Sequence, residues 1–205
     1  MHILFVGKCC PSHTINTIIQ KTGKNPGIQI VKFSRLILEG FVHNNSKVNV
    51  LSNIITEQAI FSRHHKECFE NIQYTYLPTI QVPIVCQLLH ILSSFIYTIK
   101  WALKTKGDKI ILCDIFANSS SKGSVAAAKL LNIPTCMMLT DMIAPPVTIA
   151  KDTSKWWWNI FFKMRVRSQR NSIKQYDGFV FLTKYMNDKY NPLQKPYIVM
   201  EGSVD

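Results

Sequence analysis

The residues best suited to chemistry follow apolar, strand-like runs of this 205-residue chain, at the points where each run ends. They are Gly7, Lys8, His13, Asp114, Ser119 and Asp141. Ligands of open α/β sheets lie beyond the carboxyl ends of the strands. We therefore expect these residues to line one substrate-binding edge. Thr183 and Lys184 follow a further run of this kind.

Gly7 and Lys8 suit the binding of a phosphate or a sugar. A glycine lets the backbone approach a ligand closely, and a tight turn is an equally good explanation of Gly7. Lys8 could offset the charge of a phosphate, or it could be an ordinary solvated lysine. Both interpretations stay open at this stage.

The remaining candidates carry proton-transfer or hydrogen-bonding groups. His13 is the one weak candidate for a catalytic residue, because histidine titrates near neutrality and could act as a base on a substrate hydroxyl. A polar loop histidine is the alternative. Asp114 and Asp141 could accept hydrogen bonds from sugar hydroxyls, or could cap the following helices. Ser119 and its two neighbouring serines also suit helix N-capping.

Several kinds of chemistry have no signature in the sequence. It contains no zinc-type spacing, no paired-carboxylate motif, no Ser-His-Asp arrangement and no phosphate-binding P-loop. We therefore expect neither a metal nor a cofactor. The six cysteines show no paired CxxC spacing and are interpreted as reduced.

The elements that position these residues alternate between strands and helices. Helices are expected over residues 27–43, 57–71, 85–104 and 120–131, with a loop and at most one helical turn over residues 8–26. Strands are expected over residues 2–6, 48–51, 73–77, 109–113, 135–139, 179–182 and 197–200. This order predicts an α/β fold, a Rossmann-like parallel sheet with helices on both faces. We expect residues 1–205 to form one domain.

An aromatic and basic segment, residues 155–174, predicts contact with an anionic membrane surface. Its contact residues are expected to be Trp156, Trp157, Lys163, Arg165, Arg167 and Arg170. Aromatic side chains beside a basic cluster are typical of interfacial helices. The alternative is a helix packed on the sheet with solvated basic residues. The longer apolar run that ends at residue 99 is interpreted as a buried core helix rather than a membrane span.

The charge of the chain also favours an anionic partner. The net charge is +12, from 24 basic and 12 acidic residues. Such an excess permits nucleic-acid binding, but no helix-turn-helix, zinc finger or RNP-type aromatic signature accompanies it. We therefore expect no nucleic-acid partner.

Three parts of the chain, taken in order, resemble family 4 glycosyltransferases of the capsular and exopolysaccharide type. The first part comprises KFSRLILEGF at residues 32–41 and VNVLS at residues 48–52. The second part comprises IILCDI at residues 110–115, AAAKLLNIP at residues 126–134 and MLTDM at residues 138–142. The third part comprises YDGFVFLTKYMNDKY at residues 176–190 and KPYIVMEGSVD at residues 195–205. Many members have two adjacent glycines after the first strand, where this chain has only Gly7.

This resemblance implies the N-terminal, acceptor-binding half of a GT-B fold, without the C-terminal donor-binding domain. The implied enzyme is a retaining glycosyltransferase of the hexosyltransferase type, and the chain alone is expected to be inactive. It would move a sugar from a nucleotide-sugar donor to a glycan or lipid-linked acceptor in surface polysaccharide synthesis. The expected location is cytoplasmic, peripheral on the inner face of the cell membrane. The alternative is a non-catalytic, membrane-recruiting subunit of a split glycosyltransferase.

Overall fold

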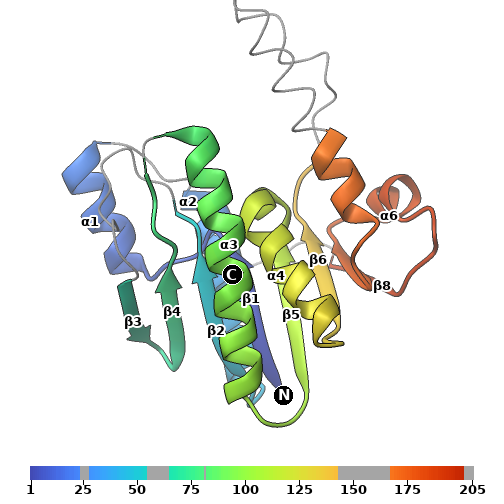
Figure 1. Cartoon of the computed structure of the whole chain (residues 1–205), viewed down its shortest axis with the longest axis horizontal. Coiled ribbons are helices and arrows are strands. Elements are labelled where there is room, and N and C mark those ends of the chain that lie inside the picture. Colours follow the sequence, from blue (N-terminus) through green and yellow to red (C-terminus); the bar gives the residue numbers. More distant parts are fainter. Residues whose placement is uncertain (24–27, 55–64, 81, 143–166, 201–205) are drawn as a thin grey trace, which may run out of the picture. The chain divides into compact units, whose positions relative to one another are not determined.

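The computed structural model describes residues 1–23, 28–54, 65–80, 82–142 and 167–200 of the chain. The chain forms two compact units, Met1–Cys136 and Met137–Asp205, and each is described by itself (Figure 1). The expectation of one domain over residues 1–205 stays a prediction. The α/β class is confirmed, since strands and helices alternate along the described segments.

The first unit is built on a mostly parallel sheet. Its strands are β1 (His2–Gly7), β2 (Lys47–Ser52), β3 (His65–Phe69), β4 (Ile72–Tyr76) and β5 (Lys109–Asp114), in the spatial order β3-β4-β2-β1-β5. β1 pairs in parallel with β2 and β5, and β2 pairs in parallel with β4. All residues of β1 after His2 are buried, as expected for a strand covered on both faces.

The edge strand β3 corrects the prediction of a helix over residues 57–71. Residues 65–69 form a strand that pairs antiparallel with β4, and Glu67 lies opposite Tyr74. The register places Glu67 on the same face of the sheet as Tyr74 and Tyr76. Residues 55–64, where the rest of that helix was expected, lie outside the described residues.

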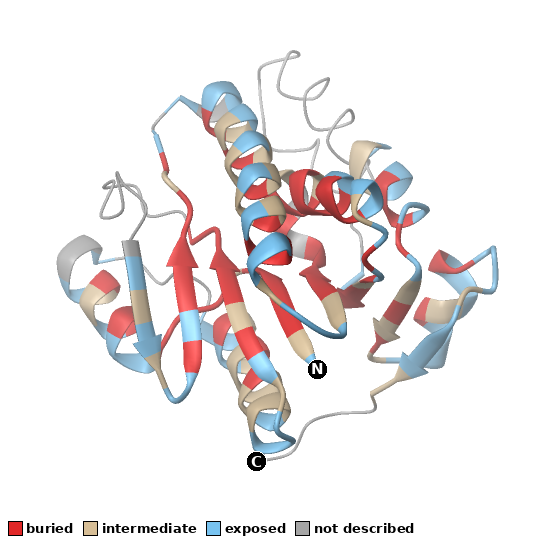
Figure 2. Cartoon of the chain, turned by 60° about the horizontal axis from the view of Figure 1, so that its bottom comes forward, coloured by how far each residue is buried: buried red, intermediate tan, exposed pale blue. Residues whose placement is uncertain are grey.

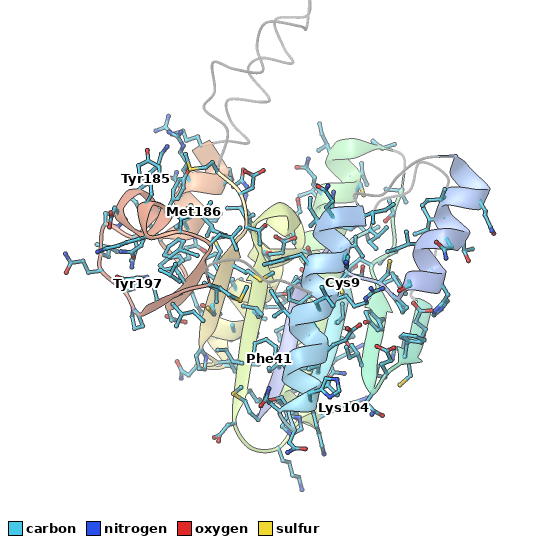
Figure 3. The ribbon with its side chains drawn as sticks, turned by 180° about the vertical axis from the view of Figure 1, so that it is seen from behind. Cys9, Phe41, Lys104, Tyr185, Met186 and Tyr197 are labelled. Carbon is cyan, nitrogen blue, oxygen red and sulfur yellow. The ribbon has the colours of Figure 1, made fainter. Side chains whose placement is uncertain are left out.

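Helices cover both faces of this sheet. α2 (Ile28–His43) lies on one face and α3 (Pro83–Lys104) on the other, as the views from opposite sides show (Figures 1 and 3). α4 (Asn118–Leu130) packs against α3, and the short 3-10 turn η1 (Ile115–Ala117) leads into it. The predicted Rossmann-like arrangement is therefore confirmed.

The first helix is longer than the single turn that the sequence suggested. Among the described side chains of α1 (Ser12–Thr22), Thr14, Ile15 and Ile18 are buried and Ile19 is half-buried, so its apolar stripe is short. It ends at Gly23, whose φ of 66° lets its N–H donate to the carbonyl of Ile19. A left-handed glycine of this kind is a common helix stop.

α3 and α4 approach each other at a glycine. A Cβ added at Gly123 of α4 would lie 2.1 Å from the carbonyl oxygen of Ile91 and 2.2 Å from the Oγ of Ser94. The two helices are further joined by a hydrogen bond of 3.0 Å from Thr98 Oγ1 to Ser124 Oγ. Small residues therefore set the spacing between these helices.

α3 is only half a core helix. Its segment Ile84–Lys104 is long and apolar enough to cross a membrane, judged by length and composition, and 28% of an apolar 18-residue window within it is buried. Figure 2 shows exposed positions along the length of α3, over the buried centres of the strands. The expectation of a buried core helix is therefore correct for one face of α3 and wrong for the other.

In the second unit, β7 (Gly178–Phe181) and β8 (Tyr197–Val199) pair in parallel, and α6 (Lys184–Tyr190) connects them. β6 (Thr135–Leu139) begins in the first unit and ends in the second. The turn after α6 is held by Asn191, whose Oδ1 accepts from Lys195 N at 2.9 Å and whose Nδ2 donates to Lys195 O at 2.8 Å. Residues 167–173 are helical.

Candidate functional site

The carboxyl ends of the parallel strands of the first unit lie along one edge of its sheet. β1, β2, β4 and β5 end at Gly7, Ser52, Tyr76 and Asp114. The registers align these ends, because Gly7 lies opposite Ser52 and Ser52 lies opposite Tyr76. This is the edge at which ligands bind in open α/β sheets.

Gly7 and Asp114, which are far apart in the sequence, are in contact. A Cβ added at Gly7 would lie 2.7 Å from the Cβ of Asp114 and 2.6 Å from the ring of Phe5. The glycine is thus required by packing between β1 and β5, a reason that does not involve a ligand. Asp114 is 1% exposed, so its carboxyl group lies beneath this edge rather than on its surface.

Ser52 and Asn53 continue this edge and were not identified from the sequence. The backbone N–H of Asn53 donates to the carbonyl of Gly7 at 3.3 Å. Ser52 Oγ and Asn53 Oδ1 are both buried and have no hydrogen-bond partner among the residues that the structure describes. Buried polar groups are nearly always satisfied by protein, water or ligand. These two oxygen atoms therefore mark the edge as a place for a polar ligand.

A second polar group is centred on Glu67, which the sequence did not single out. Its carboxylate accepts from Thr14 Oγ1 at 3.1 Å and from the hydroxyl of Tyr76. His13 Nε2 lies 3.3 Å from Glu67 Oε2. Burial, and then the hydrogen bond to Glu67, raises the pKa of Tyr76 well above its ordinary value. Tyr76 therefore remains a hydrogen-bond donor at neutral pH.

The pairing of His13 with Glu67 gives the histidine a fixed orientation. The imidazole lies against the ring of Phe69, with a centroid distance of 5.2 Å. The side chain of His13 is 56% exposed, and that of Glu67 is 19% exposed. A carboxylate that holds one imidazole nitrogen leaves the other nitrogen for proton exchange with a bound hydroxyl.

The adjacent cysteines do not supply a nucleophile. Cys9 and Cys10 follow Lys8 directly, and both are buried. Burial is the main cause that raises the pKa of Cys10 to about 12, and it also raises the pKa of Cys9 well above its usual range. Because the thiolate is the reactive form, both thiols are inert at neutral pH.

The remaining predicted site residues lie in different environments. Lys8 is half-buried after β1, and Ser119 is half-buried in the first turn of α4. The N-cap of α4 is Ala117 and no side chain caps it, so the predicted capping by Ser119 and its neighbours is wrong. Asp141 belongs to the second unit, is exposed, and accepts from the backbone N–H of Met142 at 2.7 Å.

The expected membrane-contact residues fall mostly outside the described part of the chain. Trp156, Trp157, Lys163 and Arg165 lie there. Arg167 and Arg170 are exposed on the helix over residues 167–173. Within the described ranges, no group of three or more His, Cys, Asp or Glu residues could hold a metal ion.

Comparison with known proteins identifies the fold and no family. No protein-family model matches the sequence, and no curated protein matches it. The chain is similar to the α,α-trehalose 6-phosphate synthase of Burkholderia multivorans, with a TM-score of 0.52 and 8% identity over 93% of this chain and 42% of that one. An OtsA apo structure has a TM-score of 0.48 and 9% identity over 90% of this chain and 41% of that one. For the α,α-trehalose-phosphate synthase (UDP-forming) of Burkholderia vietnamiensis the TM-score is 0.47, with 7% identity over 94% of this chain and 42% of that one.

These structures are GT-B glycosyltransferase folds. The match to the Burkholderia multivorans enzyme therefore shows that this chain has the fold of part of a GT-B glycosyltransferase. The chain spans about two fifths of the length of each solved structure it matches, 42%, 41% and 42%.

Proposed function

We propose that this chain is the acceptor-binding lobe of a GT-B glycosyltransferase that moves a sugar from a nucleotide-sugar donor to a glycan or lipid-linked acceptor. The observation that supports this most strongly is the GT-B fold, matched over 93% of the chain. The resemblance to family 4 adds retention of configuration and a role in surface polysaccharide synthesis. On this proposal a donor-binding lobe completes the enzyme, and the lobe described here is inactive by itself.

The acceptor-binding residues of this proposal lie in the first unit. Asn53, whose backbone N–H donates to Gly7, has a buried side-chain amide oxygen to which a sugar hydroxyl can donate. His13, which is 56% exposed and oriented by Glu67, accepts a hydrogen bond or a proton from an acceptor hydroxyl. Lys8, which directly follows Gly7 and is half-buried, balances the charge of an acceptor phosphate.

We further propose a peripheral location on the inner face of the cell membrane. The exposed Arg167 and Arg170 and the net charge of +12 support attraction to anionic lipid. Lipid-linked acceptors are held at such a surface, so peripheral binding would bring the lobe to its substrate.

Saturation-transfer NMR on the intact chain tests the acceptor site. The ligands are a panel of methyl glycosides and sugar phosphates; sugar phosphates are included because the Burkholderia multivorans neighbour is named for the synthesis of one. We expect saturable binding of at least one sugar, weakened about tenfold or more by Asn53→Ala, which removes a hydrogen bond to the ligand. His13→Ala is expected to weaken it similarly.

Gln20→Ala is the matched control, because Gln20 is an exposed polar residue of α1, like His13. Circular dichroism verifies that each variant is folded. If no sugar or sugar phosphate binds, or if Asn53→Ala and His13→Ala behave like Gln20→Ala, this site is not an acceptor site.

A further inference from the structure

A basic groove lies beside the C-terminal half of α3 in the first unit and includes the amino-terminal ends of β1 and β2. Its volume is about 620 Å³, and His2, Lys47, Tyr97 and Trp101 are among its lining residues. The lysines that line it are Lys47, Lys66, Lys100, Lys104 and Lys106. The described residues that line it include no Asp or Glu.

The polar side chains on the floor of the groove hydrogen-bond to one another. The lysines are therefore the groups of the groove that can bind a ligand. Trp101 Nε1 donates to Asn49 Oδ1 at 3.2 Å, and Asn49 Nδ2 donates to Gln73 Oε1 at 2.8 Å. Tyr97 OH lies 3.2 Å from Thr75 Oγ1. Five ammonium groups around a fixed floor form an electropositive surface that suits phosphate groups.

The same helix that borders the groove has an exposed apolar face. The large apolar side chains that are exposed on α3 are Ile84 (63%), Val85 (48%), Leu88 (62%), Leu92 (58%), Ile96 (42%) and Leu103 (73%). We call this set the α3 stripe. At 1.5 Å per residue it is about 28 Å long. No Asp, Glu, Lys or Arg occurs between residues 84 and 99.

The stripe leads directly into the groove. Lys100 lies one turn beyond Ile96 on the same helix, and Lys104 follows one turn later. Both lysines are exposed and line the groove. An apolar helix face bordered by lysines is the arrangement with which interfacial helices bind anionic membranes. A large exposed apolar patch on a soluble unit also indicates an interaction surface.

We propose that the α3 stripe and the lysine groove together dock the first unit onto an anionic phospholipid bilayer. The stripe lies in the interface between headgroups and acyl chains, and the groove contacts lipid phosphates. This proposal does not depend on sugar transfer or on residues 155–174.

Charge complementarity favours this occupant over a second copy of the chain. A second copy paired stripe to stripe would offer the lysines no carboxylate partner, because residues 84–99 contain no Asp or Glu and the described lining of the groove contains none either. Insertion across the bilayer is also disfavoured, because the opposite side of α3 packs on α4 through Thr98 and Ser124. Withdrawing α3 would expose that buried hydrogen-bonded face.

Co-sedimentation with vesicles tests the proposal on the intact chain. The vesicles are pure phosphatidylcholine or equal parts of phosphatidylcholine and phosphatidylglycerol, at low and at high salt. We expect binding to the anionic vesicles that weakens with salt. Each lysine near an anionic surface contributes about fivefold in partitioning, so Lys100→Glu with Lys104→Glu should lower binding at least tenfold. Leu88→Ser with Leu92→Ser should lower it by about tenfold or more, because apolar burial is lost.

Matched controls exist in the chain. Lys184→Glu with Lys189→Glu makes the same charge change on exposed residues of the second unit. Leu130→Ser with Leu193→Ser removes two leucines that are 67% and 63% exposed outside α3. Both controls should retain vesicle binding, and circular dichroism verifies that all variants are folded.

Three results would overturn the proposal. The first is no binding to anionic vesicles at low salt. The second is binding that the α3 stripe variant leaves unchanged, which would mean electrostatic adsorption alone. The third is a wild-type dimer in light scattering that the stripe variant converts to a monomer, without vesicle binding, which would assign the surface to a second copy.

Discussion

At the scale of single residues, Glu67 connects three side chains from two other elements of the first unit. Its carboxylate lies within hydrogen-bonding distance of His13 and Thr14 on α1, and it also accepts from Tyr76 on β4. The sheet therefore orients a histidine that a flexible loop would have left mobile. Cys10, which is adjacent in space, is influenced by the same carboxylate, since Glu67 is the second cause that raises its pKa.

The first prediction concerns cysteine reactivity. Cys68 is exposed on β3, whereas Cys9 and Cys10 are buried. The pKa of Cys10 is raised to about 12, so almost none of it is thiolate at pH 8. We expect a disulfide reagent such as DTNB to react first with one thiol of the native chain. That fast phase should disappear in Cys68→Ser and remain in Cys10→Ser, as measured by absorbance. A fast phase that survives Cys68→Ser would contradict the described exposure.

At the scale of elements, a glycine decides how closely α3 and α4 pack. In Gly123→Ala the added Cβ would overlap the carbonyl oxygen of Ile91, which lies 2.1 Å from its ideal position. We expect the free energy of unfolding to fall by about 1–3 kcal/mol, because α3 must move away. Urea unfolding followed by circular dichroism measures this change.

Gly40→Ala in α2 is the matched control. It is also a helical glycine, and an added Cβ there has no atom within 4 Å. This variant should raise the free energy of unfolding by about 0.5–1 kcal/mol, because glycine is a poor helix former. If the two variants change stability in the same direction, the close approach of α3 and α4 at Gly123 is wrong.

The second element-scale prediction concerns pH. His90 on α3 is 3% exposed, and burial lowers its pKa below the ordinary histidine value of 6.5. The unfolded chain therefore binds a proton near pH 6 that the folded chain does not. Stability should thus fall as pH decreases below 6.5, with a slope of at most about 1.4 kcal/mol per pH unit from one group. Burial also lowers the pKa of His2, which adds a contribution of the same sign.

His90→Gln separates these contributions. The variant should lose stability at every pH because the core is repacked, but its melting temperature should fall less steeply between pH 6.5 and 5. Above pH 7.5 the melting temperatures of the wild type and the variant should differ by an amount that does not change with pH. Parallel slopes below pH 6.5 would show that His90 titrates normally in the folded chain.

The elements that the sequence predicted correctly are those whose apolar spacing is strong. β1, β5 and α3 are recognisable because long apolar runs leave few alternatives. α1 was underestimated because burial of Ile15 and Ile18 alone gives a short stripe. The sequence predicted a helix in place of β3, because an edge strand needs little apolar pattern. Its pairing with β4 depends on the hairpin formed by residues 65–76.

The same reasoning explains which part of the candidate site was predictable. The rule that ligands bind at carboxyl ends selected Gly7 and Asp114, and the structure places them in contact. Glu67 was missed because its meeting with His13 spans 54 residues and requires β3 to be a strand. Asn53 was missed because only its burial and its lack of a hydrogen-bond partner in the described segments distinguish it.

At the scale of the whole molecule, the candidate acceptor site and the lysine groove occupy different parts of the first unit. Gly7 and Asn53 lie at the carboxyl edge of the first-unit sheet, whereas the lysine groove lies beside α3 and includes the amino-terminal ends of β1 and β2. A lobe that uses one edge for a membrane and the other for an acceptor can perform both tasks without competition. Among the described residues of the first unit, we identify no nucleotide site at either edge.

The final prediction follows from this division. If the lobe binds acceptors and a second lobe binds donors, then this chain, which spans 42% of the Burkholderia multivorans neighbour, should not turn over nucleotide sugars. We expect no release of nucleoside diphosphate above the buffer rate from UDP-, GDP- or dTDP-sugars, with or without sugar phosphates and lipid-linked acceptors. Calorimetry should likewise detect no tight binding of UDP or GDP. A complete trehalose-6-phosphate synthase in the same assay shows that the reagents are active. Turnover by this chain alone would place donor binding and transfer within these 205 residues and would refute the acceptor-lobe assignment while leaving the fold unchanged.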